Sequence, residues 1–241
     1  TLILNDNASI TSSSGYIGLA NGSLTYNGSS ASKQAIIASN VQLSNTSAAV
    51  NATITVNGTN TSGDLVINGA IWRDGAGLTK AGTGKLVLNG ENSYTGGTTI
   101  SAGRLIGTSS SLQGAITNNS ALEFAQTSSG TYSGIVGGNG SFTKSGAGKL
   151  IVSGNNTYSG ITTVSQGSLA VNGSLGNTAV SVGSNATLQG SGSIGGSVTI
   201  NSLGTLSAGN SIESLAMGTL TLQSGSNFIQ EVDSSATVGT Q

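Results

Sequence analysis

The sequence predicts an all-β protein, a right-handed parallel β-helix, on three observations. Short segments that alternate apolar and polar residues run along the whole chain. Aliphatic residues recur in its C-terminal part at a nearly constant interval. The stretch at 78–105 is also repeated at 142–169, 64 positions later, with 15 identities and no gap. A fixed period near 20 is typical of a solenoid, in which each turn buries its apolar face against its neighbours.

The strands are predicted from segments such as NATITVNG at 51–58, KLVLNG at 85–90, KLIVSG at 149–154 and SVTIN at 197–201. Each alternates apolar residues with Thr, Ser, Asn or Lys and reaches a Gly, Asn or Ser turn. No segment keeps a helical spacing over three turns, and the 39 glycines disfavour helix, since each interior glycine costs about 1 kcal/mol. The chain has no proline, so every residue keeps the N–H that a strand ladder needs.

The period predicts which residues stack in the core. Two aliphatic series recur at steps of 18 or 19 positions: Val164, Val182 and Ile200, and Leu169, Leu188 and Leu206. If successive turns stack, each series forms an inward column with steps of about 4.8 Å. The interval of 64 positions would then be about three turns, so we expect the two copies to stack three turns apart. A β-sandwich or barrel is the alternative, but neither requires a constant interval.

We expect one β-helical fragment over 1–241. Residues 1–77 read as less regular turns, 78–169 hold the two copies, and 170–241 read as regular turns. Thr1 begins a strand-like segment and not a signal peptide, so we expect the sequence to be a piece of a longer protein. No apolar run approaches the ~18 residues that span a bilayer.

The composition argues against several kinds of function. Seven basic and eight acidic residues give a net charge of -1, which disfavours nucleic-acid binding. Without histidine or cysteine the commonest catalytic bases and nucleophile partners are missing, so we expect no enzyme activity. A carbohydrate-active β-helix is a weaker alternative, but the acids are scattered, and Glu231 and Asp233 read as a solvated edge. GGNGS at 137–141 lacks the Asp of calcium repeats, so no metal or cofactor is expected.

Matching positions of the two copies hold four lysines, Lys80, Lys85, Lys144 and Lys149. They predict a sparse basic stripe that contacts acidic glycans, or turn-flanking charges that keep the stack soluble and discourage edge association. We favour the second interpretation.

Three aromatic residues have two interpretations each. Tyr94 and Tyr158 occupy one repeat position; packing along a corner with a bonded hydroxyl is favoured over sugar stacking. Trp72, the single tryptophan, lies beside Arg73 and either covers the core or makes a surface contact.

The two copies resemble a known repeat. T-K-x-G-x-G-K-L runs over 79–86 and 143–150, G-x-N-x-Y-x-G-x-T-T over 90–99 and 154–163, and G-x-L over 103–105 and 167–169. This pattern resembles the passenger-associated repeat of bacterial autotransporters, the type V secretion proteins. The segment after the second copy is similar to the part that precedes the membrane barrel in such proteins. It departs from the family at Ala208, where a proline is usual, and at Glu213, where a small residue or proline is frequent.

The resemblance implies a β-helical stalk that is exported across the outer membrane and stays on the cell surface or is secreted. It implies that 170–241 lead to a cap or junction before the protein's own C-terminal β-barrel, and that the C-terminal part folds early. The expected partners are glycans or proteins of host or bacterial surfaces, or further copies of the chain. The alternative is a passive stalk for an enzyme or toxin whose active domain lies upstream of residue 1.

Overall fold

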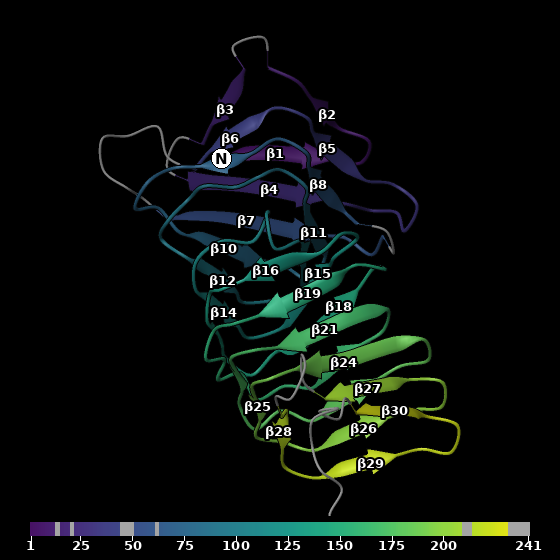
Figure 1. The fold of residues 1–241 in the computed structure, drawn as a ribbon. Helices are drawn as coiled ribbons and strands as arrows, with labels where there is room; N and C mark the ends of the chain where they lie inside the picture. The colour runs from purple at the N-terminus through teal and green to yellow at the C-terminus, as the bar shows by residue number, and fades with distance from the viewer. Residues whose placement is uncertain (13–14, 20–21, 44–50, 61–62, 209–213, 231–241) are drawn as a thin grey trace, which may run out of the picture.

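The computed structural model describes residues 1–12, 15–19, 22–43, 51–60, 63–208 and 214–230. This part of the chain is all β, and every strand pair is parallel (Figure 1). The strands lie across a long axis and stack from the N-terminal end to the C-terminal end, as a parallel β-helix requires. The fold prediction is therefore confirmed. Among these residues no helix has the length and apolar character needed to cross a membrane.

Each turn, here called a rung, passes three sides of the helix. The middle side is an eleven-stranded sheet that runs nearly the whole length. Its strands are β2 (Ser9–Ile10), β5 (Ala35–Ile37), β8 (Leu65–Ile67), β11 (Lys85–Leu88), β13 (Arg104–Gly107), β15 (Ala121–Ala125), β18 (Ser141–Ser145), β20 (Thr162–Val164), β23 (Val180–Val182), β26 (Val198–Ile200) and β29 (Leu220–Leu222).

The first side begins as a seven-stranded sheet and continues as a three-stranded one. The seven strands are β1 (Leu2–Asn5), β4 (Ser23–Asn27), β7 (Ala52–Asn57), β10 (Leu78–Ala81), β12 (Thr98–Ile100), β14 (Ile116–Asn118) and β17 (Val136–Gly137). The three strands are β22 (Ser174–Leu175), β25 (Ser193–Ile194) and β28 (Ala216–Met217). Residues 155–158 connect the two sheets, through hydrogen bonds to Val136 below and Ser174 above.

The third side begins as a three-stranded sheet and continues as a six-stranded one. The three strands are β3 (Tyr16–Gly18), β6 (Asn40–Gln42) and β9 (Ile71–Trp72). The six are β16 (Gly130–Tyr132), β19 (Lys149–Val152), β21 (Gly167–Val171), β24 (Ala186–Gly190), β27 (Thr205–Ala208) and β30 (Asn227–Gln230).

The core is a set of inward columns, because alternate residues of each strand point to the helix interior. In the middle sheet Val164 pairs with Val182 and Val182 with Ile200. In the six-stranded sheet Leu169, Leu188 and Leu206 pair in the same way. All six side chains are buried. Stacking of like residues thus removes their apolar surface from water, which no single rung could do alone.

The two copies do not stack on one another, and this corrects the sequence prediction. Going up the first side, Leu78 pairs with Thr98, Thr98 with Ile116 and Ile116 with Val136, so three turns end at Val136. The chain continues round a corner before Phe142 begins the second copy. As a result β10 lies in the first side, whereas its counterpart β18 lies in the middle side. The second copy is turned by one side relative to the first.

Asparagines form short ladders on the outside of the helix. Asn57 donates to Asn27 at 3.0 Å and Asn89 to Asn68 at 2.8 Å. Asn185 also takes a left-handed backbone conformation, with φ of 60°. Glu213, Glu231 and Asp233, and the side chain of Ala208, lie outside the residues that the structure describes.

Candidate functional site: the repeated two-rung module

Each copy of the repeat folds onto itself. In the first copy β10 pairs with β12 and β11 pairs with β13, so the two halves of one motif form two stacked rungs. In the second copy β18 pairs with β20 and β19 pairs with β21. We call each such unit a module, residues 78–105 and 142–169. The paired positions are one turn of chain apart, for example Leu86 and Leu105. A module therefore needs only short chain closures to form its contacts.

A buried lysine holds the corner of each module. Lys80 and Lys144 follow Leu78 and Phe142 by two positions, so they point inward, and each is 0% exposed. The Nζ of Lys80 donates to the carbonyls of Ala81, Gly82 and Ala102 at 2.8–3.0 Å. Because the third of these carbonyls belongs to the next rung, the ammonium joins two rungs.

Lys144 repeats this arrangement. Its Nζ donates to the carbonyls of Ser145, Gly146 and Gln166 at 2.7–3.1 Å. Three acceptors match the three N–H donors of an ammonium group. The prediction that Lys80 and Lys144 are surface contacts, or solubilising charges, was therefore wrong. The physical reason is that the corner carbonyls supply the partners that a buried ammonium needs.

The burial of these lysines changes their titration. Burial lowers the pKa of Lys80 from 10.5 to about 8, although the nearby Asp64 carboxylate favours the charged form. Burial likewise lowers the pKa of Lys144 to about 8. The carbonyl acceptors stabilise the ammonium and oppose this change.

The tyrosines close the opposite corner of each module. The hydroxyls of Tyr94 and Thr98 are 2.7 Å apart, and those of Tyr158 and Thr162 are also 2.7 Å apart. Both rings are buried, which confirms the packing interpretation over sugar stacking. Burial raises the pKa of Tyr94 to about 12 and raises that of Tyr158 further. Both phenols are therefore neutral at physiological pH.

The asparagine two residues before each tyrosine joins three rungs. Asn156 Oδ1 accepts the N–H of Val136 in the rung below at 2.9 Å, and its Nδ2 donates to the carbonyl of Ser174 in the rung above at 3.1 Å. Asn92 makes the same pair of contacts, with Ile71 below and Ser111 above. Both amides are buried. They supply the inter-rung hydrogen bonds where the backbone leaves the strand conformation, and the sequence analysis did not predict this role.

The G-x-L ending of the motif needs its glycine. Gly103 and Gly167 have φ of 68° and 63°, in the left-handed region. A Cβ at Gly103 would lie 2.3 Å from the carbonyl oxygen of Gly84 and 2.8 Å from the Nζ of Lys80. A side chain at this position would therefore displace the lysine from its carbonyls.

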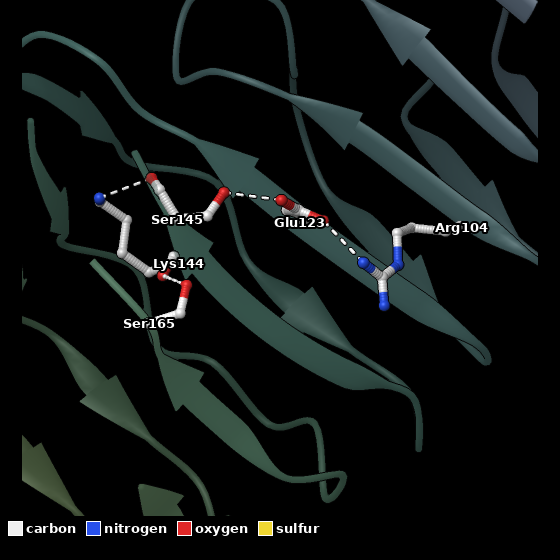
Figure 2. Close-up of polar contacts among 5 residues, drawn as sticks. All are labelled: Arg104, Glu123, Lys144, Ser145 and Ser165. Atoms are coloured by element: carbon white, nitrogen blue, oxygen red, sulfur yellow. Dashed lines mark hydrogen bonds and ion pairs between the residues drawn. The ribbon is translucent and has the colours of Figure 1, made fainter. Parts of the chain in front are cut away.

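An external polar network lies between the modules on the middle sheet. Arg104 Nη1 is 2.9 Å from Glu123 Oε2, and Ser145 Oγ donates to Glu123 Oε1 at 2.6 Å. Figure 2 shows Glu123 between the other two side chains, with Lys144 turned to the opposite side of Ser145. Ser165 Oγ in turn donates to the backbone carbonyl of Lys144 at 3.1 Å. This network joins the end of the first module to the start of the second.

The other residues predicted to contact a partner are scattered over the surface. Lys85 lies on the middle sheet and Lys149 on the third side, and both are half-buried. Trp72 and Arg73 are also half-buried, at the end of β9. The structure therefore brings the motif residues together inside the helix and does not form a basic stripe on its surface. In the part of the chain that the structure describes, no group of acidic residues could hold a metal ion.

Comparison with known proteins agrees with the repeat. The family described as passenger-associated-transport-repeat matches residues 78–106 and 142–171, the two self-stacking units. The adhesin BmaC autotransporter of Brucella suis biovar 1 (strain 1330) is 40% identical over 82 residues. The chain carries two passenger-associated transport repeats, the repeat that the resemblance to autotransporter passenger domains predicts. Two extracellular serine proteases of Serratia marcescens match this chain at 47% and 38% identity, over 70 and 90 residues.

These matches cover only a minor part of this chain and a very small part of each relative. They cover 33% of the chain and 2% of the adhesin, and 29% and 37% of the chain against 6% and 8% of the proteases. No solved structure matches the chain significantly. The family places the chain outside the outer membrane, on the cell surface or secreted.

Proposed function

We propose that the segment is a rigid stalk that assists folding during export and presents an adhesive surface outside the cell. The observation that carries the first part is the self-stacking module. Each copy pairs its own two halves, and each of these pairings closes a single turn of chain. A formed rung gives the next one an edge to pair with, so each module can serve as a starting point for stacking.

Buried polar groups support a templating role for the modules. Lys144 joins the two rungs of the second module through three backbone carbonyls. Asn156 connects the module to the rung below through the N–H of Val136 and to the rung above through the carbonyl of Ser174. Such groups are costly unless every bond is made, so they favour one register of stacking over others. The absence of cysteine is consistent with this role, because no disulfide can form before export.

The adhesive part of the proposal rests on the outer faces. A column of hydroxyl side chains follows the outside of the middle sheet over five successive rungs: Thr143, Thr163, Ser181, Thr199 and Thr221. One hydrogen bond contributes only about 0.5–1.5 kcal/mol, so attachment through such a column requires many contacts at once. The similarity to an adhesin supports this reading.

A passive stalk is the second candidate, with an enzyme or toxin domain upstream of residue 1. The similarity to extracellular serine proteases favours it. In that case the segment is a rigid spacer that assists export and does not bind a partner itself.

Expression of the full-length protein on cells that otherwise stay dispersed tests both candidates. Surface display is measured with an epitope tag, and clumping or host-cell attachment is scored per displayed molecule. We expect deletion of 1–241 to lower display and attachment, and K144M to lower display mainly. Unchanged attachment per displayed molecule after the deletion would contradict adhesion and support the passive stalk. Unchanged display in both variants would contradict the folding role.

A further inference from the structure

Two aromatic side chains depart from the pattern of the rest. The chain has one tryptophan, five tyrosines and three phenylalanines. Six of these nine rings are buried in the core: Tyr26, Tyr94, Phe124, Tyr132, Phe142 and Tyr158. Phe228 lies in β30, the last described strand of its sheet, above Leu206. The other two, Tyr16 and Trp72, are 56 positions apart in the sequence and meet on the outside of the helix.

The strand register places both rings on the outer face of the β3-β6-β9 sheet. Val41 pairs with Ile17 and Ile71, and this column points inward. The residues on either side of it therefore point outward. Trp72 belongs to one flanking column and Tyr16, two strands away, to the other.

The two rings form a corner. Their centroids are 6.0 Å apart and their planes are inclined at 73°, an edge-to-face arrangement that holds both rings in place. Tyr16 remains 46% exposed. Two large rings at the surface, one exposed and one half-buried, are unusual in a chain that buries most of its other aromatics, and exposed apolar patches commonly mark binding sites.

Polar groups lie beside the rings. Asn40 pairs with Tyr16 across the sheet, and Gln42 pairs with Trp72. Asn40 Oδ1 accepts the N–H of Ala70 at 2.9 Å, which fixes this amide on the outer face. Carboxamides offer both donors and acceptors, as sugar hydroxyls require. Next to Trp72 the charges of Arg73 and Asp74 have opposite sign, so the patch favours an uncharged ligand.

We propose that Trp72 and Tyr16 form a binding platform for an uncharged glycan. One ring face stacks on the C–H groups of a pyranose, the second ring forms a wall, and the side chains of Asn40 and Gln42 bond its hydroxyls. A protein partner fits less well, since a stable protein interface buries about 800 Å² on each side and this patch consists of two rings and two amides. The proposal rests on the proposed adhesive function and adds to the outer hydroxyl column a site with a defined class of ligand.

The single tryptophan makes the test specific to the site. The chain is titrated with dextran, yeast mannan and a galactan, while tryptophan emission and its quenching by acrylamide are recorded. We expect at least one polysaccharide to shift the emission to shorter wavelength and reduce quenching. Affinity electrophoresis in gels that contain the same polysaccharides should show retardation, with binding weakened at least tenfold in W72A and several-fold in Y16A and in W72F.

T131A is the matched control, because Thr131 is an exposed residue of β16, outside the β3-β6-β9 sheet that carries the platform. It should bind as the parent chain does. Circular dichroism verifies that each variant is folded. The platform would be overturned if none of the three polysaccharides gave a response. It would also be overturned if W72A and Y16A bound as tightly as the parent chain. Binding to cells that survives periodate oxidation of their glycans but not protease treatment would instead indicate a protein partner and overturn the glycan assignment.

The outcome also separates this site from the stalk function. Cell attachment by the full-length protein that W72A leaves intact, together with no polysaccharide response in the chain, would reject the platform and keep the adhesive stalk. Polysaccharide binding through Trp72 without cell attachment would keep the platform and reject adhesion.

Discussion

The two modules share their internal contacts and differ in their position on the helix. Both have a caged lysine, a tyrosine–threonine pair and an asparagine that reaches one rung down and one rung up. Yet the first module occupies the first and middle sides, and the second occupies the middle and third sides. The motif therefore specifies a two-rung unit and not a place on the circumference. A solenoid permits this because each rung contacts only its neighbours.

Their surroundings are not the same. In the second module Phe142 stacks on Tyr158, with centroids 5.5 Å apart and planes 14° apart, and it also lies 5.4 Å from Phe124. The first module has Leu78 at the position of Phe142. In the first module the Asp64 carboxylate favours the charged form of the buried lysine, whereas in the second module burial is the cause of the lowered pKa of Lys144. If internal contacts dominate, equivalent substitutions should have equal effects; if surroundings dominate, they should not.

The largest effect is expected from the caged lysines. K80M and K144M each leave three carbonyls without their ammonium partner, which should lower the free energy of unfolding by about 3 kcal/mol. Urea denaturation measures this. K149M, on the outer face of β19, is the control and should change stability by less than about 0.5 kcal/mol. If the losses of unfolding free energy in K80M and K144M differed by more than half, the surroundings of each module, and not the three carbonyls around the lysine, would set the stability.

The next largest loss of unfolding free energy is expected from substitution of the two buried asparagines. N92A and N156A each remove two inter-rung hydrogen bonds from buried positions, so a loss of about 2 kcal/mol is expected in each case. N172A, an exposed asparagine, serves as the control. Amide hydrogen exchange sharpens the comparison, because N156A should increase exchange at Val136 in the rung below. Protection there equal to that of the parent chain would contradict the proposed link.

Smaller losses of unfolding free energy are expected from substitution of the two tyrosines. Y94F and Y158F remove one buried hydroxyl pair each and should cost about 1 kcal/mol in thermal or urea unfolding. F142L gives the second module the residue that the first module has at this position. It should lower the free energy of unfolding by less than about 1 kcal/mol, through loss of ring stacking. A neutral F142L would indicate that the aromatic neighbours contribute only buried area.

The weakest effect is a pH dependence, because the carbonyl cages oppose the shift that burial causes. With pKa values near 8 when folded and 10.5 when unfolded, both lysines bind more protons in the unfolded state between these values. Stability should therefore rise from pH 8 to pH 10. Above pH 10 the raised pKa of Tyr94 reverses the trend, because the unfolded state then loses a proton first. The K80M/K144M double variant should lack the rise, and a fall in the parent chain over this range would refute the assignment.

Much of the fold followed from the sequence, because its determinants are local and periodic. Val164, Val182 and Ile200 lie at steps of 18, and the structure stacks them in one column. The rotation of the second copy did not follow, since it depends on the summed lengths of corners whose sequences carry no period. The burial of Lys80 had a signal that was missed: it follows Leu78 by two positions in a strand, which places both on one face.

The outer platform had no such signal. Tyr16 and Trp72 are brought together by the register of three strands in the least regular part of the chain, where the turns are longest, as from Asn40 to Ala70. The two readings of Trp72 could not be separated without that register. The role of Asn92 and Asn156 was hidden for a related reason, because their partners lie in other rungs.

Cysteine cross-linking tests the rotation of the second module most directly, in a chain that has no cysteine of its own. Thr143 neighbours Glu123 in the middle sheet, whereas Thr117 lies in the first side, in the column of the equivalent residue Thr79. We expect E123C/T143C to form a disulfide readily under mild oxidation, as T143C/T163C should, and T117C/T143C to form none. Cross-linking of the 117/143 pair without the 123/143 pair would place the second copy on the same side as the first and contradict the account.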